Sequence, residues 1–294
     1  MIKLGDCMLV NFKQMLNAAR KEKRAIPHFN INNLEWTKYI LEECEKLQEP
    51  VILGVSESAS KYMGGFHTIV GFVKGLIKDL NITIPVCLHL DHGKTFEICK
   101  KAIDAGFSSV MIDASKLELT ENIKLTKKVV DYAHKHNVTV EAEIGYIGEQ
   151  KEKMPDRAIA TVEDCLNLYE QTGIDALAPA LGNLHGFYER EPNLNFERMK
   201  EISSSIFIPL VLHGGSGIPD KQIKKAIQYG INKINVNTEL QSAWTQAIRK
   251  YIENNQEEYD PRKIIGSGEK AIKKVVLEKI KIFNTSQEEN HENN

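Results

Sequence analysis

The sequence predicts an α/β fold, a (β/α)8 TIM barrel in which eight parallel strands alternate with helices and one additional helix follows at the C-terminus. Short apolar and β-branched runs alternate along the 294 residues with amphipathic stretches that carry charge on one face. Eight such runs can be counted, and no stretch rich in proline, glycine and serine divides the chain. We therefore expect a single barrel domain over residues 1–283, followed by a polar, disordered tail over 284–294.

The predicted strands are apolar on both faces, which is typical of a parallel sheet covered by helices. They are Ala25–Asn30, Pro50–Ser56, Ile84–His92, Ser108–Ala114, Thr139–Gly145, Ala176–Leu181, Ile208–His213 and Lys233–Thr238. Helical patterns follow them, clearest at Thr95–Ala105, Glu121–His136 and Asp220–Tyr229, and Glu269–Phe283 is the additional C-terminal helix. The long polar connection Tyr146–Ala160 interrupts this alternation of strands and helices and predicts a mobile lid.

Composition excludes several classes of partner. The chain has 38 basic and 40 acidic side chains, so its net charge of −2 gives no reason to expect a nucleic acid or an anionic membrane. No apolar run approaches bilayer length, and the N-terminus lacks the pattern of a secretion signal. The scattered cysteines form no C-x-x-C pair and indicate a reducing compartment, so we expect a cytoplasmic protein; they are Cys7, Cys44, Cys87, Cys99 and Cys165.

Three histidines stand where an apolar run ends against a glycine: His92 before Gly93, His185 before Gly186 and His213 before Gly214. The carboxyl ends of barrel strands are where active sites of this fold are built. Neutral imidazoles converging from separate strands are the ligands of an open catalytic zinc site. The alternative is that an Asp-His pair merely caps the end of a strand. That would explain one such pair, but not histidines at three equivalent strand ends.

Neighbouring side chains on a strand point to opposite faces, so Asp91 and His92 reach one site only if the strand turns, which Gly93 permits. The remaining histidines are not expected to be ligands. His28 and His89 are interpreted as hydrogen-bonded core residues.

Two carboxylates, Asp113 and Glu143, end the fourth and fifth predicted strands. A buried carboxylate is costly unless it is paired or bound to a metal. These two therefore bind a second cation or hold a histidine ligand in place. The alternative is a salt bridge to a lysine inside the barrel.

The loops after the seventh and eighth predicted strands contain glycines, hydroxyls and amides, in Gly214–Gly217 and Asn235–Thr238. Barrels commonly hold phosphate in these two loops. A metal beside a phosphate pocket predicts chemistry on a phosphorylated carbonyl compound, whose enediolate the cation stabilises. The competing mechanism is covalent activation by a Schiff-base lysine, but the sixth predicted strand contains no lysine.

These residues lie in longer motifs that resemble the class II, metal-dependent ketose-bisphosphate aldolases, fructose-bisphosphate aldolases among them. The resemblance runs from Met8 to Phe283 through five motifs: HFNINN from His28, LHLDHG from Leu88, EAE from Glu141, LVLHGGSGIP from Leu210 and DPRK from Asp260. It implies a catalytic zinc on His92, His185 and His213, and a second divalent or monovalent cation at Asp113 and Glu143.

The resemblance also implies roles for the pocket residues. Asp91 would move the proton on the C4 oxygen, and Ser56 would contact the glyceraldehyde phosphate half of the substrate. The dihydroxyacetone phosphate half would be held by Gly186, Gly214, Gly215, Ser216, Asn235, Val236, Asn237 and Thr238. Members of the family are homodimers or homotetramers, and a three-histidine site accepts cobalt, iron or manganese as well as zinc.

Two positions depart from the family pattern. Lys151 stands where the lid usually carries an acid, and an ammonium group cannot accept a proton; Glu149 or Glu152 would substitute. Glu189 stands where many relatives have a phosphate-binding lysine, and Arg190 would replace that lysine.

Three hypotheses follow from the sequence. The first is metal-dependent cleavage of fructose 1,6-bisphosphate to dihydroxyacetone phosphate and glyceraldehyde 3-phosphate. The second is the same chemistry on tagatose bisphosphate or a phosphorylated deoxy-ketogluconate. The third is a diverged paralogue that binds metal and phosphosugar with little turnover.

Overall fold

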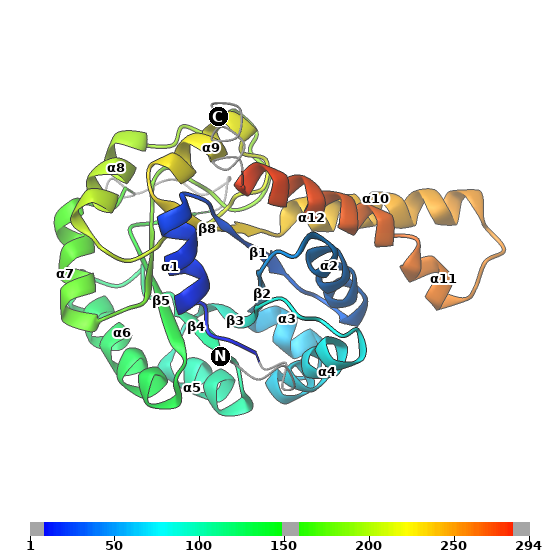
Figure 1. The fold of residues 1–294 in the computed structure, drawn as a ribbon, viewed down its shortest axis with the longest axis horizontal. Coiled ribbons are helices and arrows are strands. Elements are labelled where there is room, and N and C mark those ends of the chain that lie inside the picture. Colours follow the sequence, from blue (N-terminus) through cyan, green and yellow to red (C-terminus); the bar gives the residue numbers. More distant parts are fainter. Residues whose placement is uncertain (1–8, 149–158, 285–294) are drawn as a thin grey trace.

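Eight parallel strands form one closed barrel in which the strands follow one another in chain order, and helices surround it (Figure 1). The computed structural model describes residues 9–148 and 159–284. The strands are β1 (Ile26–Asn30), β2 (Val51–Ser56), β3 (Val86–Gly93), β4 (Ser109–Ile112), β5 (Thr139–Ile144), β6 (Ala176–Pro179), β7 (Leu210–Leu212) and β8 (Ile231–Val236). The predicted (β/α)8 TIM barrel is confirmed.

Helices precede, connect and follow the strands, and most of them pack an apolar face against the outside of the barrel. They are α1 (Lys13–Glu22), α2 (Leu34–Leu47), α3 (Glu57–Tyr62), α4 (Phe66–Asp79), α5 (Phe96–Ala105), α6 (Leu119–Ala133), α7 (Val162–Thr172), α8 (Phe196–Ser205), α9 (Asp220–Gln228), α10 (Thr238–Asn254), α11 (Pro261–Gly266) and α12 (Glu269–Phe283). Helices α10 and α11 project from the barrel as an arm, and α12 returns along α10 and α2 (Figure 1).

Several helices begin at a polar residue that caps them soon after a strand ends. Ser56 ends β2 and accepts a hydrogen bond from the Ala59 amide, and Asn33 and Thr95 cap α2 and α5 in the same way. Such caps satisfy amides that the helix itself leaves unpaired. They keep the connections at the carboxyl ends of the strands short, so the polar strand ends remain at the mouth of the barrel.

Helix α1, which the sequence interpretation did not include, closes the opposite end of the barrel (Figure 1). Phe12, Met15, Leu16 and Ala19 join a buried cluster with inward-facing residues near the beginnings of the strands, Ile26, Ile52, Cys87, Ala176, Ala178 and Val211. A larger cluster fills the space between the barrel and its outer helices. The barrel is therefore open only at its carboxyl mouth.

The eighth strand differs from its prediction. It spans Ile231–Val236 rather than Lys233–Thr238, because Gly230 makes the preceding turn with φ of 105° and α10 already begins at Thr238. Helix α6 ends at Ala133, and a 3-10 turn over His134–His136 completes the predicted helix.

No helix in the described ranges is long and apolar enough to cross a bilayer. Cys44, Cys87, Cys99 and Cys165 are free and buried, while Cys7 lies outside the described residues. The expected tail also lies outside them, except for Asn284.

The barrel interior leaves no room for a side chain at Gly54. A Cβ atom there would lie 1.7 Å from Nε2 of the fully buried His28. We expect Gly54→Ala to lower the free energy of unfolding by about 1–3 kcal/mol or more, because the imidazole must move within a packed interior. The matched control is Gly71→Ala in α4, where the new methyl group would have no described atom within 4 Å beyond its chain neighbours and the backbone of its own helix; that change should raise stability by up to about 1 kcal/mol. Equal midpoints for both variants in denaturant unfolding would contradict the packing argument.

Candidate active site

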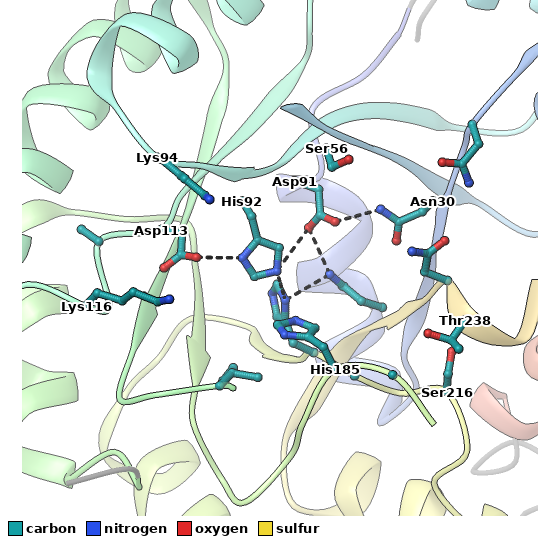
Figure 2. Close-up of a pocket in the computed structure, with 18 of the residues that line it drawn as sticks. Asn30, Ser56, Asp91, His92, Lys94, Asp113, Lys116, His185, Ser216 and Thr238 are labelled. Carbon is teal, nitrogen blue, oxygen red and sulfur yellow. Dashed lines mark hydrogen bonds and ion pairs between the residues drawn. The ribbon is translucent and has the colours of Figure 1, made fainter. Parts of the chain in front are cut away.

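A pocket of about 600 Å³ opens at the carboxyl mouth of the barrel (Figure 2). Residues from most of the strand ends line it. Those expected from the sequence are Ser56, Asp91, His92, Asp113, His185, Gly186, His213, Gly214, Ser216, Asn235, Asn237 and Thr238. The structure therefore brings together side chains that lie as far apart in the chain as Ser56 and Thr238.

His92, His185 and His213 meet at one point in this pocket. Each offers a ring nitrogen, and these nitrogens all lie within 4.8 Å of one another. Nε2 of His92 and Nδ1 of His213 are 3.0 Å apart, and the His92 ring packs edge-on against both other imidazoles. Zinc binds histidine nitrogens at about 2.0–2.1 Å, which places the nitrogens of one site roughly 3–4 Å apart. The donor set therefore fits a single divalent cation.

Asp91 and His92 both reach the site because β3 is irregular at its end. The pairing with β4 shifts register between Leu90 and Gly93, and His92 has a left-handed backbone with φ of 51°. The turn thus occurs at His92 itself, one residue before the glycine that was expected to permit it. Gly93 is needed for another reason, since a Cβ atom there would lie 2.8 Å from the Met111 carbonyl oxygen.

A buried ion pair holds His213 from inside the barrel. Oε1 of Glu141 lies 2.8 Å from His213 Nε2, and Oε2 lies 2.9 Å from Lys233 Nζ; all three side chains are fully buried. Burial, His92 and Lys233 lower the pKa of His213 well below its usual value. His213 is therefore neutral, with Nε2–H donating to Glu141 and the Nδ1 lone pair facing His92. This is the second-sphere carboxylate arrangement that orients metal-binding histidines.

The carboxylate of Asp91 is fixed by two amides. Asn30 Nδ2 donates to Oδ2 at 2.8 Å, and Asn235 Nδ2 donates to Oδ1 at 3.4 Å. Burial favours the protonated form, but the positive charge on His92 and further neighbours outweighs it and holds the pKa of Asp91 well below its usual range. Asp91 is ionised at neutral pH and can accept a proton.

Asp113 and Glu143 lie on the other side of His92. Oδ2 of Asp113 is 3.0 Å from His92 Nδ1, and Oε2 of Glu143 is 3.8 Å from the same nitrogen. Burial and the nearby Asp113 raise the pKa of Glu143 to about 8, whereas hydrogen bonds from His92 and Ser115 outweigh burial and lower that of Asp113. Both carboxylates and His92 offer ligand atoms within 4.8 Å of one another. A neutral imidazole has one lone pair, so a cation on His92 Nε2 leaves Nδ1–H to donate to Asp113, which then holds this ring in place.

The loops that carry His185 and His213 touch through a glycine. Gly214 has φ of 64°, and a Cβ atom there would lie 1.9 Å from the Leu184 carbonyl oxygen. The Tyr188 hydroxyl joins the same loops, since it donates to the Gly214 carbonyl at 3.1 Å and accepts from the Leu184 amide at 2.9 Å. These contacts set the separation of the two imidazoles.

Three residues expected at the substrate do not line the pocket. Gly215 already donates its amide to the Asn235 carbonyl, and Val236 is a fully buried strand residue. A hydrogen bond of Tyr188 fixes the loop that follows His185. Arg190, in the same loop, is exposed and does not line the pocket. Glu149 and Glu152, the expected lid acids, lie outside the described residues.

Some residues in or beneath the pocket were not recognised from the sequence. Glu141 could have been found, because it lies two residues before Glu143 and therefore points to the same face of β5. Asn32, which was not expected, lines the pocket together with the expected Asn237, and each has a buried amide atom, Nδ2 and Oδ1, with no partner among the described residues. Buried amide atoms of this kind call for a polar ligand. Lys94 and Lys116 also line the pocket (Figure 2).

A second group, of His28, His89 and Asp91, also brings ligand atoms within 4.8 Å. His89 was correctly expected to be hydrogen-bonded, since Nδ1 lies 2.8 Å from Ser109 Oγ. The expectation was wrong for His28, whose ring nitrogens have no hydrogen-bond partner among the described residues. Burial and the charge of Lys233 lower the pKa of both imidazoles. The same buried ammonium disfavours a cation at this position.

Comparison with known proteins agrees with this geometry. Residues 10–288 match the profile of the family described as fructose-bisphosphate aldolase class-II. The chain belongs to the class II fructose-bisphosphate aldolase family. Among relatives, it is 54% identical over 280 residues to a fructose-bisphosphate aldolase of Geobacillus stearothermophilus, covering 95% of this chain and 98% of the relative. It is 56% identical, with the same coverage, to one of Staphylococcus aureus strain Mu50.

Solved aldolase structures have the same fold. The YdjI aldolase from Escherichia coli K12 aligns with a TM-score of 0.82 and 36% identity, over 94% of this chain and 97% of that one. A fructose-bisphosphate aldolase from Campylobacter jejuni aligns with a TM-score of 0.82 and 25% identity, over 94% and 96%. The likeness to class II aldolases therefore extends over almost the whole chain.

The Glu141 carboxylate offers a direct test of this site. We expect Glu141→Gln to lower the free energy of unfolding by about 3–5 kcal/mol, because it leaves Lys233 as an unpaired buried charge. Zinc affinity should fall about 10- to 100-fold, because an amide holds His213 less firmly than a carboxylate. Competition with a chromophoric chelator measures the affinity, and denaturant titration measures stability.

The matched control for this change is Glu163→Gln on the exposed side of α7, which should alter neither quantity. Zinc binding by Glu141→Gln that is as tight as in the unmodified protein would contradict the assigned role.

Proposed function

We propose that this protein cleaves fructose 1,6-bisphosphate between C3 and C4 into dihydroxyacetone phosphate and glyceraldehyde 3-phosphate, and also catalyses the reverse condensation. The observation that carries the proposal is the meeting of His92, His185 and His213 beside an ionised Asp91 at the mouth of the barrel. Relatives named fructose-bisphosphate aldolase share more than half of their residues with this chain, which supports the substrate.

The three imidazoles are proposed to hold zinc. When bound, the ion supplies the Lewis acid that polarises the ketose carbonyl and stabilises the negative charge that develops on the substrate oxygens. The neutral state of His213 supports this role, because only an unprotonated nitrogen can coordinate. Burial by itself would lower the pKa of His92, but Asp91, Asp113 and Glu143 raise it to about 10, so a cation binds His92 by displacing a proton. Asp113 and Glu143 are proposed to hold a second divalent or monovalent cation.

Asp91 is proposed to take the proton from the C4 hydroxyl as the C3–C4 bond breaks. Its hydrogen bonds from Asn30 and Asn235 hold the carboxylate in one orientation, which is what a general base needs. In the condensation direction the same carboxyl group returns the proton to the C4 oxygen. Glu149 or Glu152 is proposed to exchange the proton on the ketone half.

The phosphate of the dihydroxyacetone half is proposed to lie in the loops after β7 and β8. Ser216, Asn237 and Thr238 line the pocket there, and the adjacent loops add Gly186 and Gly214. The buried amide oxygen of Asn237 has no hydrogen-bond partner among the described residues, which supports the placement of a substrate hydroxyl beside it. Ser56, at the end of β2, is proposed to contact the aldehyde half.

We further propose that the protein is cytoplasmic and forms a homodimer or homotetramer. The four described thiols are all free, which suits a reducing compartment. Ile252 and Tyr259 are 46% and 90% exposed on or beside the arm formed by α10 and α11, and such apolar groups suit a contact with a second copy (Figure 1). Sedimentation velocity would report a monomer if this proposal fails.

Metal removal tests the function directly. In an assay coupled to dihydroxyacetone phosphate, treatment with a chelator should abolish cleavage of fructose 1,6-bisphosphate, and added zinc should restore it, because the ion held by the three imidazoles is the group proposed to polarise the carbonyl. Tagatose bisphosphate and a phosphorylated deoxy-ketogluconate serve as comparison substrates. Activity that persists in chelator would overturn the metal mechanism, and a higher kcat/KM on either comparison substrate would overturn the assignment of substrate.

The lid acid can be identified by single substitution. Changing Glu149 and Glu152 separately to glutamine should reduce kcat by roughly 100-fold or more at one position and little at the other, because only one carboxylate exchanges the proton. Lys151→Gln is the control and should leave kcat nearly unchanged. Full activity of both glutamine variants would show that the proton travels by another route.

A further inference from the structure

A pair of reciprocal hydrogen bonds joins two loops at one end of the pocket. The amide of Glu239, in the first turn of α10, donates to the hydroxyl oxygen of Ser216 at 3.3 Å, and the amide of Gly217 donates to Oε1 of Glu239 at 2.7 Å. This exchange resembles a capping box, in which a side chain and a helix end satisfy each other within one segment. Here it joins the loop after β7 to the helix that follows β8, and Figure 2 shows Ser216 close to Thr238 at this end of the pocket.

The carboxylate of Glu239 also contacts a buried cation. Nζ of Lys279, on α12, lies 2.7 Å from Oε1 and 2.7 Å from Oε2 of Glu239. Lys279 is only 7% exposed, and a lysine so deeply buried is costly unless its charge is paired. Helix α12 is the additional C-terminal helix, and it packs along α10 (Figure 1). The Glu239 carboxylate therefore links the loop after β7 to α12.

We propose that Glu239 is a positioning residue for the loop that holds the phosphate of the dihydroxyacetone half, and that Lys279 cancels the charge of its carboxylate so that this phosphate can bind nearby. The inference rests on the proposed function, which places that phosphate in the loops after β7 and β8. The side chains that line the pocket in these loops are uncharged; they belong to Ser216, Asn235, Asn237 and Thr238. An uncompensated carboxylate beside Ser216 would repel a phosphate dianion, because like charges interact strongly where protein replaces water.

The two parts of the proposal depend on different properties of the Glu239 side chain. Holding the Gly217 amide requires only a hydrogen-bond acceptor, which the amide group of a glutamine also provides. Repelling a phosphate requires the negative charge, which a glutamine lacks. Removal of the Lys279 charge leaves the carboxylate unpaired, and a simultaneous change of Glu239 to glutamine removes the repulsion. Recovery of phosphate affinity in that double variant therefore distinguishes an electrostatic role of Lys279 from a purely structural one.

Calorimetric titration of the zinc-loaded protein with dihydroxyacetone phosphate, at low ionic strength, tests both parts. We expect Lys279→Met to weaken binding about 10-fold, because the unpaired carboxylate repels the phosphate. The double variant Lys279→Met/Glu239→Gln should bind within about 2-fold of the unmodified protein, since both changes act on one charge pair. Lys279→Met/Glu239→Ala should bind about 3- to 10-fold more weakly than the glutamine double variant, because it lacks the acceptor for the Gly217 amide. Lys274→Met, which removes an exposed lysine paired with Glu278 on the same helix, is the matched control and should leave the affinity unchanged.

The other outcomes separate this proposal from the function on which it rests. Failure of the unmodified protein to bind dihydroxyacetone phosphate would refute the proposed function, and this inference with it. If the unmodified protein binds, undiminished binding by Lys279→Met, or equally weak binding by Lys279→Met/Glu239→Gln, would overturn the electrostatic role of Lys279. Equal affinities of the glutamine and alanine double variants would overturn the positioning role of Glu239. Lys279→Gln, which keeps a hydrogen-bond donor but not the charge, should show the same loss as Lys279→Met and replaces it if that variant does not fold.

Discussion

The site depends on a negative charge placed inside the barrel. Glu141 is fully buried on β5, where it forms an ion pair with Lys233 on β8 and accepts a hydrogen bond from His213, which directly follows β7. This contact fixes which nitrogen of His213 carries the proton, and hence which one can bind a cation. Burial and the same ammonium group lower the pKa of His28 and His89 well below its usual value, so both imidazoles are neutral.

Much of the fold could be predicted because strands that are buried on both faces of a parallel sheet appear in the sequence as short apolar runs. All eight strands lie where apolar runs predicted them, and errors are confined to their ends, as where Gly230 starts β8 earlier. The candidate metal ligands could also be recognised, since His92, His185 and His213 each precede a glycine. Asp91 and His92 lie at the end of β3 and His213 directly follows β7, whereas His185 lies in the loop after β6. Helix α1 was missed because it precedes the repeating pattern and packs across the floor of the barrel rather than beside a strand.

The remaining parts of the site depend on tertiary geometry that cannot be predicted from a local sequence pattern. The left-handed backbone at His92, rather than at Gly93, results from the register shift between β3 and β4. Arg190 lies two residues after Tyr188, whose hydroxyl group hydrogen-bonds to Leu184 in the same loop and to Gly214 in the loop after β7. The lysines that line the pocket could not be told apart from other surface lysines, because which loop residues face the mouth is decided by how the loops after β3 and β4 bend.

Helix α1 covers the amino ends of the strands, and packed side chains fill the barrel between this helix and the site. The pocket therefore opens toward the carboxyl mouth. A sugar and the two fragments made from it must pass the same opening, so either fragment that is still bound keeps the next sugar out. A substitution that slows the departure of one fragment would lower turnover even where bond cleavage is unchanged.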